Sequence, residues 1–244
     1  KRIEVKKGQL DQLRPIPQAI LEKLREEVFL NWIYNSNAIE GSTITLQETR
    51  LILKTGLTVG GKSLREHFEV INHKEAIRYV EDLVQSTVAI SAFHVRQIHK
   101  LILTNVDDEN AGSYRQTQVR IAGSEMMPPE AWRVEGLMDD WNQWISANAE
   151  EMHPVVFAAL AHHRLVSIHP FIDGNGRTAR LVMNLLLMKK GYPPTIILRT
   201  NRRQYYTVLA LADDGKPEAL VNFAGRAVEQ SLDLYLEACK PSTR

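Results

Sequence analysis

HPFIDGNGRTAR, residues 169–180, is followed directly by the apolar run LVMNLLLM of residues 181–188. A run of this length and hydrophobicity predicts a buried helix. The glycines Gly174 and Gly176 therefore stand where a loop turns into that helix. Backbone N–H groups at the start of a helix lack partners and, with the helix dipole, favour an anion. Glycines let the backbone approach such an anion closely, so the stretch predicts a phosphate-binding loop.

The other residues of the stretch carry matching chemistry. Arg177 and Arg180 lie three apart, on one face of the predicted helix, and both can hold phosphate or carboxylate oxygens. Asp173 offers a hard oxygen ligand for a Mg²⁺ that carries phosphates. His169 has the side chain whose ordinary pKa suits a general base. Together they predict transfer of a nucleotide or phosphoryl group; the alternative is a helix-capping loop with surface arginines.

The stretch resembles the Fic-domain signature H-x-F-x-[DE]-G-N-G-R-x-x-R at every fixed position. Most Fic proteins transfer AMP from ATP to a hydroxyl of a target protein. The resemblance implies an all-α domain with a small β-hairpin flap, catalysis by His169 and Mg²⁺ on Asp173. It also implies AMP transfer rather than phosphorylation, because phosphorylating relatives carry Lys at the position of Gly176. The implied ATP-binding residues are Gly174, Asn175, Gly176, Arg177, Arg180, Tyr205 and Tyr206.

SNAIEG, residues 36–41, ends an earlier helical pattern. A Glu near a helix C-terminus opposes the helix dipole, which suggests that Glu40 has a positive partner elsewhere. The hexapeptide resembles the Fic inhibitory motif [S/T]-x-x-x-E-[G/N]. The resemblance implies that Ser36 and Glu40 belong to an autoinhibitory helix, with Glu40 on Arg180, and that residues 1–62 precede a catalytic domain of residues 63–244. The alternative for the hexapeptide is a solvated helix end. For the reaction, the alternatives are removal of AMP from a modified target (de-AMPylation) and transfer of another nucleotide at the same site.

GLTVGGKS, residues 56–63, fits the Walker A pattern of a P-loop ATPase. A P-loop needs a preceding strand and a parallel sheet, whereas a capped helical pattern precedes this stretch. We therefore expect a glycine-rich turn, with Ser63 and Glu66 capping the next helix. Fic relatives with a similar GKSL turn can dimerise there, which implies a homodimer near Leu64.

Residues 114–129 form the only clear hairpin candidate, and we call them the flap segment. Side chains alternate in a β manner from Thr117 to Ile121, and Met126 to Pro129 return the chain. The segment resembles the Fic flap, which pairs with a target segment by β-augmentation. The alternatives are a plain structural hairpin and a target-binding module without catalysis. The implied target-binding residues are Thr117, Gln118, Val119, Arg120 and Ile121.

The remaining patterns are helical from about Pro17 to Glu40 and over 45–55, 63–86, 91–105, 130–148, 154–168, 202–212 and 217–238. We expect residues 1–14 to form a loose lead-in. Tyr205 and Tyr206 border the adenine in relatives, and simple packing is the alternative. Asp213 stands where relatives often carry Asn. His94 and His99 are five apart, which is wrong for two ligands on one helix face, so they are expected to be structural and no zinc site is expected.

Composition limits the class of partner. The net charge is +1, which argues against nucleic acid as a partner. A single cysteine fits a reducing compartment, so a cytoplasmic location is expected. No stretch approaches the apolar length of a membrane span. The expected partner is a target protein with a Ser, Thr or Tyr hydroxyl, with self-modification also possible. The chain begins at Lys1, so we expect it to be trimmed.

Overall fold

The computed structural model describes residues 1–121 and 126–240, and in these ranges the regular structure is helical throughout. The all-α fold class is therefore confirmed. The helices are α1 Arg2–Gln12, α2 Gln18–Ile39, α3 Leu46–Thr55, α4 Leu64–Gln85, α5 Ala92–Leu103, α6 Val134–Asn148, α7 Pro154–Ile168, α8 Asn175–Lys189, α9 Arg202–Asp213 and α10 Glu218–Ala238, with short 3₁₀ helices η1 Ala131–Arg133 and η2 Arg199–Asn201.

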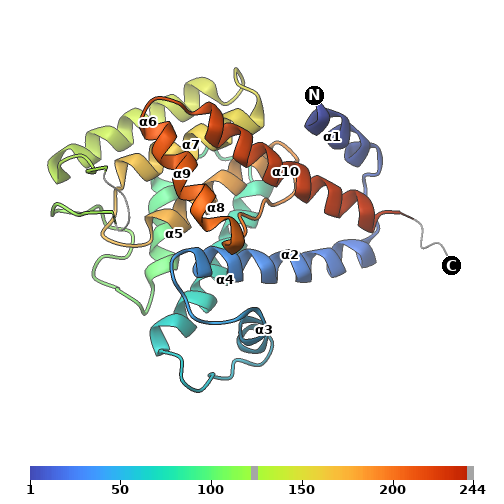
Figure 1. Ribbon diagram of the computed structural model, residues 1–244, viewed down its shortest axis with the longest axis horizontal. Coiled ribbons are helices and arrows are strands. Elements are labelled where there is room, and N and C mark those ends of the chain that lie inside the picture. Colours follow the sequence, from blue (N-terminus) through green and yellow to red (C-terminus); the bar gives the residue numbers. More distant parts are fainter. Residues whose placement is uncertain (122–125, 241–244) are drawn as a thin grey trace.

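The apolar helix α8 lies near the centre of the molecule (Figure 1). All of its residues from Arg177 to Leu187 are buried, as a run without a polar face requires. Helices α4, α5 and α7 pack directly against it, and α2 touches it as well. Because α8 starts at Asn175, this packing holds the helix N-terminus that follows the predicted phosphate-binding loop against the core.

Local sequence signals set the helix starts. Thr45 and Ser63 each cap a helix and form reciprocal capping boxes with Glu48 and Glu66. Burial acts to raise the pKa of Glu66, but hydrogen bonds from Thr43 and Ser63 outweigh it and lower that pKa to about 2. The ionised carboxylate therefore ties the start of α4 to the chain that follows α2.

The expectation of a loose lead-in is wrong. Residues 2–12 form α1, which packs on α10. Leu10 is 1% exposed, and Lys6 bonds Glu229 and Asp233 of α10 at 2.9 and 2.7 Å. A short polar helix has little intrinsic stability, so these tertiary contacts decide the structure of the segment.

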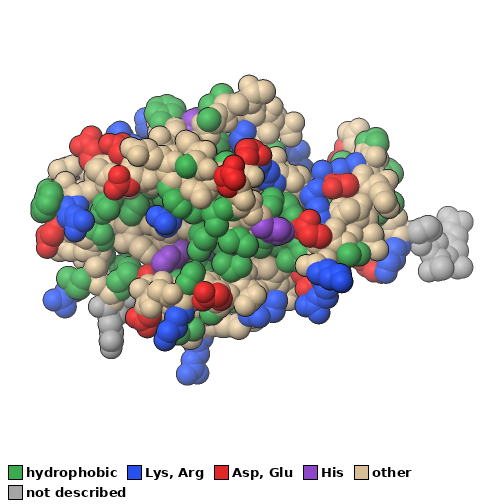
Figure 2. Space-filling model, turned by 90° about the horizontal axis from the view of Figure 1, so that it is seen from above, with side chains coloured by type: hydrophobic (Ala, Val, Ile, Leu, Met, Phe, Trp, Pro, Cys, Tyr) green, Lys and Arg blue, Asp and Glu red, His purple; other side chains and the backbone are tan. Residues whose placement is uncertain are grey.

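The surface carries no single-sign field on the face drawn in Figure 2, where basic and acidic side chains alternate among apolar ones. In the described part of the chain, no helix combines the length and hydrophobicity needed to cross a bilayer.

Candidate active site

His169 ends α7 in a left-handed conformation, with φ 50° and ψ 59°. Its N–H still bonds the carbonyl of Leu165 at 3.1 Å, so the chain turns sharply while the helix stays capped. This conformation is unfavourable for a residue other than glycine by about 1–2 kcal/mol. The surrounding structure therefore has to hold the histidine in place.

His169 is half-buried, and burial of its ring lowers the pKa of the imidazole to about 4. The Val166 carbonyl opposes this effect, and the charge of Arg115 adds to it. Nδ1 lies inside the protein. At neutral pH the imidazole is therefore uncharged and can accept a proton, as a general base must.

The loop after His169 is held by its own side chains. Asn175 brackets the main chain of Phe171, accepting from its N–H and donating to its carbonyl, both at 2.9 Å. Gly174 adopts φ 75°, and a Cβ there would lie 3.3 Å from the ring of His99. Asn175 therefore fixes the loop, and only one N–H of its amide remains for a ligand.

His99 supports the loop from behind. Its Nδ1 accepts from the N–H of Gly112 at 3.0 Å, so Nε2 carries the proton that bonds the Asp173 carbonyl at 2.9 Å. The ring stacks on Phe171 with centroids 3.6 Å apart, and burial lowers its pKa to about 4. Sequence patterns place His99 on a buried helix face but do not reveal that it orients the loop.

Asp173 and Arg177 belong to a network with two residues of α4. Arg65 contacts the Asp173 carboxylate at 2.5 Å, and Glu69 contacts Arg177 at 3.2 Å. Burial acts to raise the pKa of Asp173, but Arg177, the Gly174 N–H and Arg65 outweigh it and lower the pKa. The carboxylate is thus ionised and 44% exposed, as an oxygen ligand for a hard cation should be. Arg65 and Glu69 were not predicted from the sequence, because charges on an exposed helix face are ordinary.

Arg180 reaches the end of α2. Its Nε and Nη2 donate to the hydroxyl and carbonyl of Ser36, at 3.1 and 2.8 Å. Its Nη1 lies 2.8 Å from the Glu40 carboxylate, and the arginine side chain is only 4% exposed. The partner that the helix-end argument required for Glu40 is therefore Arg180, across 140 residues of sequence.

The same carboxylate lies against the phosphate-binding loop. A Cβ built on Gly176 would lie 2.3 Å from Oε1 of Glu40, closer than any real contact. Glu40 therefore occupies the space directly over the first turn of α8. An anion held by that turn would meet a negative charge already there.

The expected adenine-side residues differ in exposure. Tyr205 is 1% exposed, its hydroxyl pairs with Nε2 of His162 at 2.8 Å and its ring packs behind Arg180, while a contact to ATP stays a prediction. Tyr206 is half-buried, and Cζ of Arg202 lies 4.9 Å from the centroid of its ring. Asp213 is engaged by His163 at 2.8 Å and by Ser167 at 3.1 Å.

The flap segment shows no strand in its described residues, 114–121 and 126–129. Its two arms are nevertheless joined, because the side-chain amide of Gln118 donates to the Pro128 carbonyl at 2.9 Å. Thr117, Gln118 and Arg120 are exposed, whereas Val119 and Ile121 are half-buried. The tip of the expected hairpin, residues 122–125, lies outside the described residues.

The Walker-like stretch is a turn between two helices. Gly56 ends α3 in a left-handed conformation, and Ser63 caps α4. Lys62 is used locally, donating to the Thr43 carbonyl at 2.7 Å. With helices on both sides, the P-loop alternative is wrong. Leu64 is 62% exposed and so is accessible to a second copy of the chain; a homodimer at this position stays a prediction.

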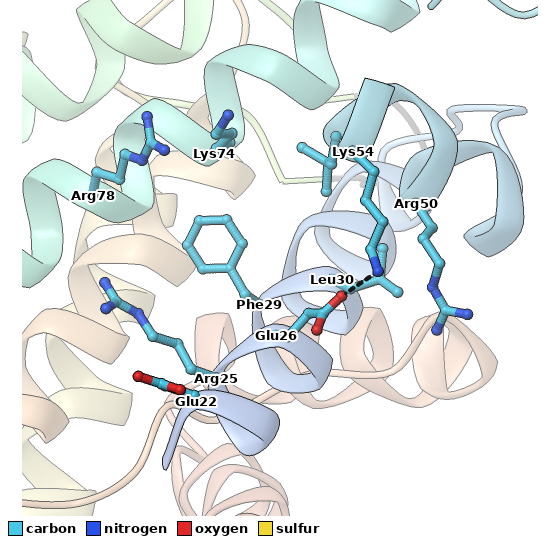
Figure 3. A pocket seen from close by; sticks show the side chains of 10 residues that line it. Glu22, Arg25, Glu26, Phe29, Leu30, Arg50, Lys54, Lys74 and Arg78 are labelled. Carbon is cyan, nitrogen blue, oxygen red and sulfur yellow. Dashed lines mark ion pairs between the residues drawn. The ribbon is translucent and has the colours of Figure 1, made fainter. Parts of the chain in front are cut away.

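A groove of about 510 Å³ lies between α2, α3 and α4. Its cationic lining residues, labelled in Figure 3, are Arg25, Arg50, Lys54, Lys74 and Arg78. Lys54 pairs with Glu26 at 2.6 Å and Arg25 with Glu81 at 2.5 Å. No residue of the 169–180 stretch lines it. The groove is therefore not the candidate active site.

Comparisons with known proteins agree with this geometry. The Fic/DOC family matches residues 89–187, which include the flap segment, His169 and most of α8. Two relatives named protein adenylyltransferase Fic, from Nematostella vectensis and Drosophila melanogaster, are 43% and 39% identical over 93% and 98% of the chain. The chain spans only about half of their length, 53% and 49%.

Solved structures share the whole fold. Fic-1 from C. elegans superposes with a TM-score of 0.89 at 33% identity, over 98% of this chain and 72% of its own. A Fic domain containing signaling protein from Bacteroides thetaiotaomicron gives 0.93 at 27% identity, over 98% and 97%. With the motif, the geometry and these relatives in agreement, the chain belongs to the Fic/DOC family.

Proposed function

We propose that the protein is an adenylyltransferase that moves AMP from ATP to a Ser, Thr or Tyr hydroxyl of a target protein. The observation that carries the proposal is the site itself: a neutral, half-buried His169 directly before a backbone anion site backed by two buried arginines. The names of the relatives support the same activity.

Each residue has a step in the reaction. The N–H groups at the start of α8 hold the α- and β-phosphates, with the free N–H of Asn175 beside them, while Arg177 and Arg180 neutralise the outer phosphates. His169 takes the proton of the target hydroxyl through Nε2 as its oxygen attacks the α-phosphorus. The bond from that phosphorus to the bridging oxygen breaks, and pyrophosphate leaves. Positioning and charge neutralisation provide most of the catalysis.

Asp173 fits a magnesium ion held jointly with the nucleotide. Among the described residues, no group of three or more His, Cys, Asp or Glu side chains could hold a metal ion. Mg²⁺ commonly binds through one or two carboxylates together with substrate phosphates and waters, which a single ionised Asp173 allows. When bound, it would neutralise charge on the phosphates; Arg65 would first have to leave the carboxylate.

Glu40 supports an autoinhibited resting state. Its carboxylate holds Arg180 and fills the space over Gly176, so an incoming nucleotide loses a cationic partner and meets a like charge. The same carboxylate could instead activate water to remove AMP from a modified protein. The two roles separate in Glu40→Gly, which raises transfer in the first case and abolishes removal in the second.

Labelling protein with ATP that carries the label at one of two positions tests the proposal. The Glu40→Gly protein is incubated with a cell lysate, Mg²⁺ and ATP labelled on either the α- or the γ-phosphate. Lysate kinases transfer the γ-phosphate in every sample, so the readout is the label that is lost when His169→Ala is added to Glu40→Gly. That label should come from the α-position alone. Incorporation of γ-label that depends on His169 would indicate phosphorylation and overturn the proposal.

A further inference from the structure

Arg115 is a buried cation within the flap segment that the reaction above does not use. It is 1% exposed, although arginine is rarely buried without a charged partner. All of its side-chain hydrogen bonds to described residues end at main-chain carbonyls. Nε donates to His169 at 2.8 Å, Nη1 to Thr117 at 3.1 Å, and Nη2 to Pro129. Its own N–H donates to Pro170 at 2.9 Å.

These carbonyls come from three separate places. Thr117 lies on the outgoing arm of the flap segment, Pro129 on the returning arm, and His169 at the turn that carries the proposed base. A guanidinium is planar and presents its donors in a fixed fork. One rigid group therefore sets the positions of both arms relative to His169.

The contact to His169 falls where the backbone is under strain. His169 is left-handed, and Arg115 holds its carbonyl and the next one, that of Pro170. Among the described residues, its side-chain hydrogen-bond partners are main-chain carbonyls. Burial lowers the pKa of Arg115, and the charge of Glu130 opposes this only in part. Apolar packing would avoid the desolvation of a buried cation, so retaining one here suggests a geometric requirement.

We propose that Arg115 is a positioning residue that sets the register between the flap segment and His169. The proposal rests on the proposed function, in which the flap segment presents the target hydroxyl. A hydroxyl displaced by about 1 Å from its attacking position can lose on the order of 100-fold in rate. Water, which reaches the α-phosphorus without the flap segment, does not depend on this register. Loss of the fork therefore reduces transfer to protein more than transfer to water.

The test compares the two acceptors in one reaction. Arg115→Lys keeps the charge but lacks the fork, and it is introduced into the Glu40→Gly protein. With α-labelled ATP, labelled protein reports transfer to a hydroxyl and free AMP reports transfer to water. We expect the ratio of protein label to free AMP to fall at least tenfold. Affinity for a non-hydrolysable ATP analogue and the thermal midpoint should stay close to those of the parent.

Arg133→Lys is the matched control, since Arg133 is an exposed arginine close in sequence to the returning arm, and it should leave the ratio unchanged. An unchanged ratio in Arg115→Lys would overturn the proposal, as would equal losses for both acceptors with weaker ATP binding. If Arg115→Lys does not fold, Arg115→Gln replaces it; failure of both to fold would assign Arg115 to folding alone. A Glu40→Gly parent that transfers AMP to neither acceptor would instead refute the proposed function.

Discussion

Replacing Glu40 tests the contact between α2 and α8. The Glu40–Arg180 pair spans 2.8 Å, and at an effective dielectric constant of 20 its direct attraction is about 6 kcal/mol. Desolvation offsets much of this, and a hydrogen bond to a charged group contributes about 1.5–3 kcal/mol net. Arg180 keeps both bonds to Ser36 in the variant, so its position should persist.

We therefore expect Glu40→Gly to raise the initial rate of AMP incorporation by about 10- to 150-fold, at tenfold for each 1.4 kcal/mol. The assay uses α-labelled ATP well below saturation. Glu40→Gln should give a smaller increase, because its amide loses the charge but still lies against Gly176. Glu27→Gln, an exposed carboxylate of the same helix, should change nothing. A folded Glu40→Gly protein with an unchanged or lower rate would refute the reasoning.

Three other predictions follow from the site. Because burial lowers the pKa of His169 to about 4, its ring should titrate near that pH when followed by NMR. The contribution of the uncharged ring to the free energy of unfolding should be full above about pH 6.5 and should be lost as the pH falls toward 4. A ring pKa near 6.5 would contradict the burial. Asp173→Asn should weaken Mn²⁺ binding in the presence of an ATP analogue, as measured by electron paramagnetic resonance. Arg65→Gln should strengthen that binding, because it frees the Asp173 carboxylate. Equal effects of the two variants would show that Asp173 is not a ligand of the metal ion. Lys62→Ala should retain AMP transfer, because Lys62 bonds Thr43, and loss of transfer with a folded protein would revive a role in ATP binding.

Periodicity and capping were enough to place most helices. The expected helices 63–86, 91–105 and 154–168 match α4, α5 and α7 within two residues at each end, since Ser63 and Pro154 are unambiguous starts. The prediction for residues 1–14 was wrong because α1 is stabilised by α10, more than 200 residues away, and the local sequence carries no sign of that contact. The division at residue 62 stays a prediction.

The residues proposed to react could be named from the sequence, but the residues that support them could not. His169 and Arg180 stand in a motif whose residue types are chemically demanding, and the unfavourable helix-end charge indicated a partner for Glu40. Arg65, His99 and Arg115 act through contacts to a carboxylate or to backbone carbonyls of distant segments. Such contacts depend on how helices pack, so no local pattern distinguishes these residues from ordinary helix or loop residues.

Mass spectrometry of the modified protein tests the central claim most directly. Lysate treated with Glu40→Gly, ATP and Mg²⁺ is compared with lysate treated with Glu40→Gly carrying His169→Ala. We expect peptides bearing one AMP on a Ser, Thr or Tyr hydroxyl in the first sample and none in the second. Peptides bearing a phosphate instead, or AMP adducts that persist without His169, would contradict it.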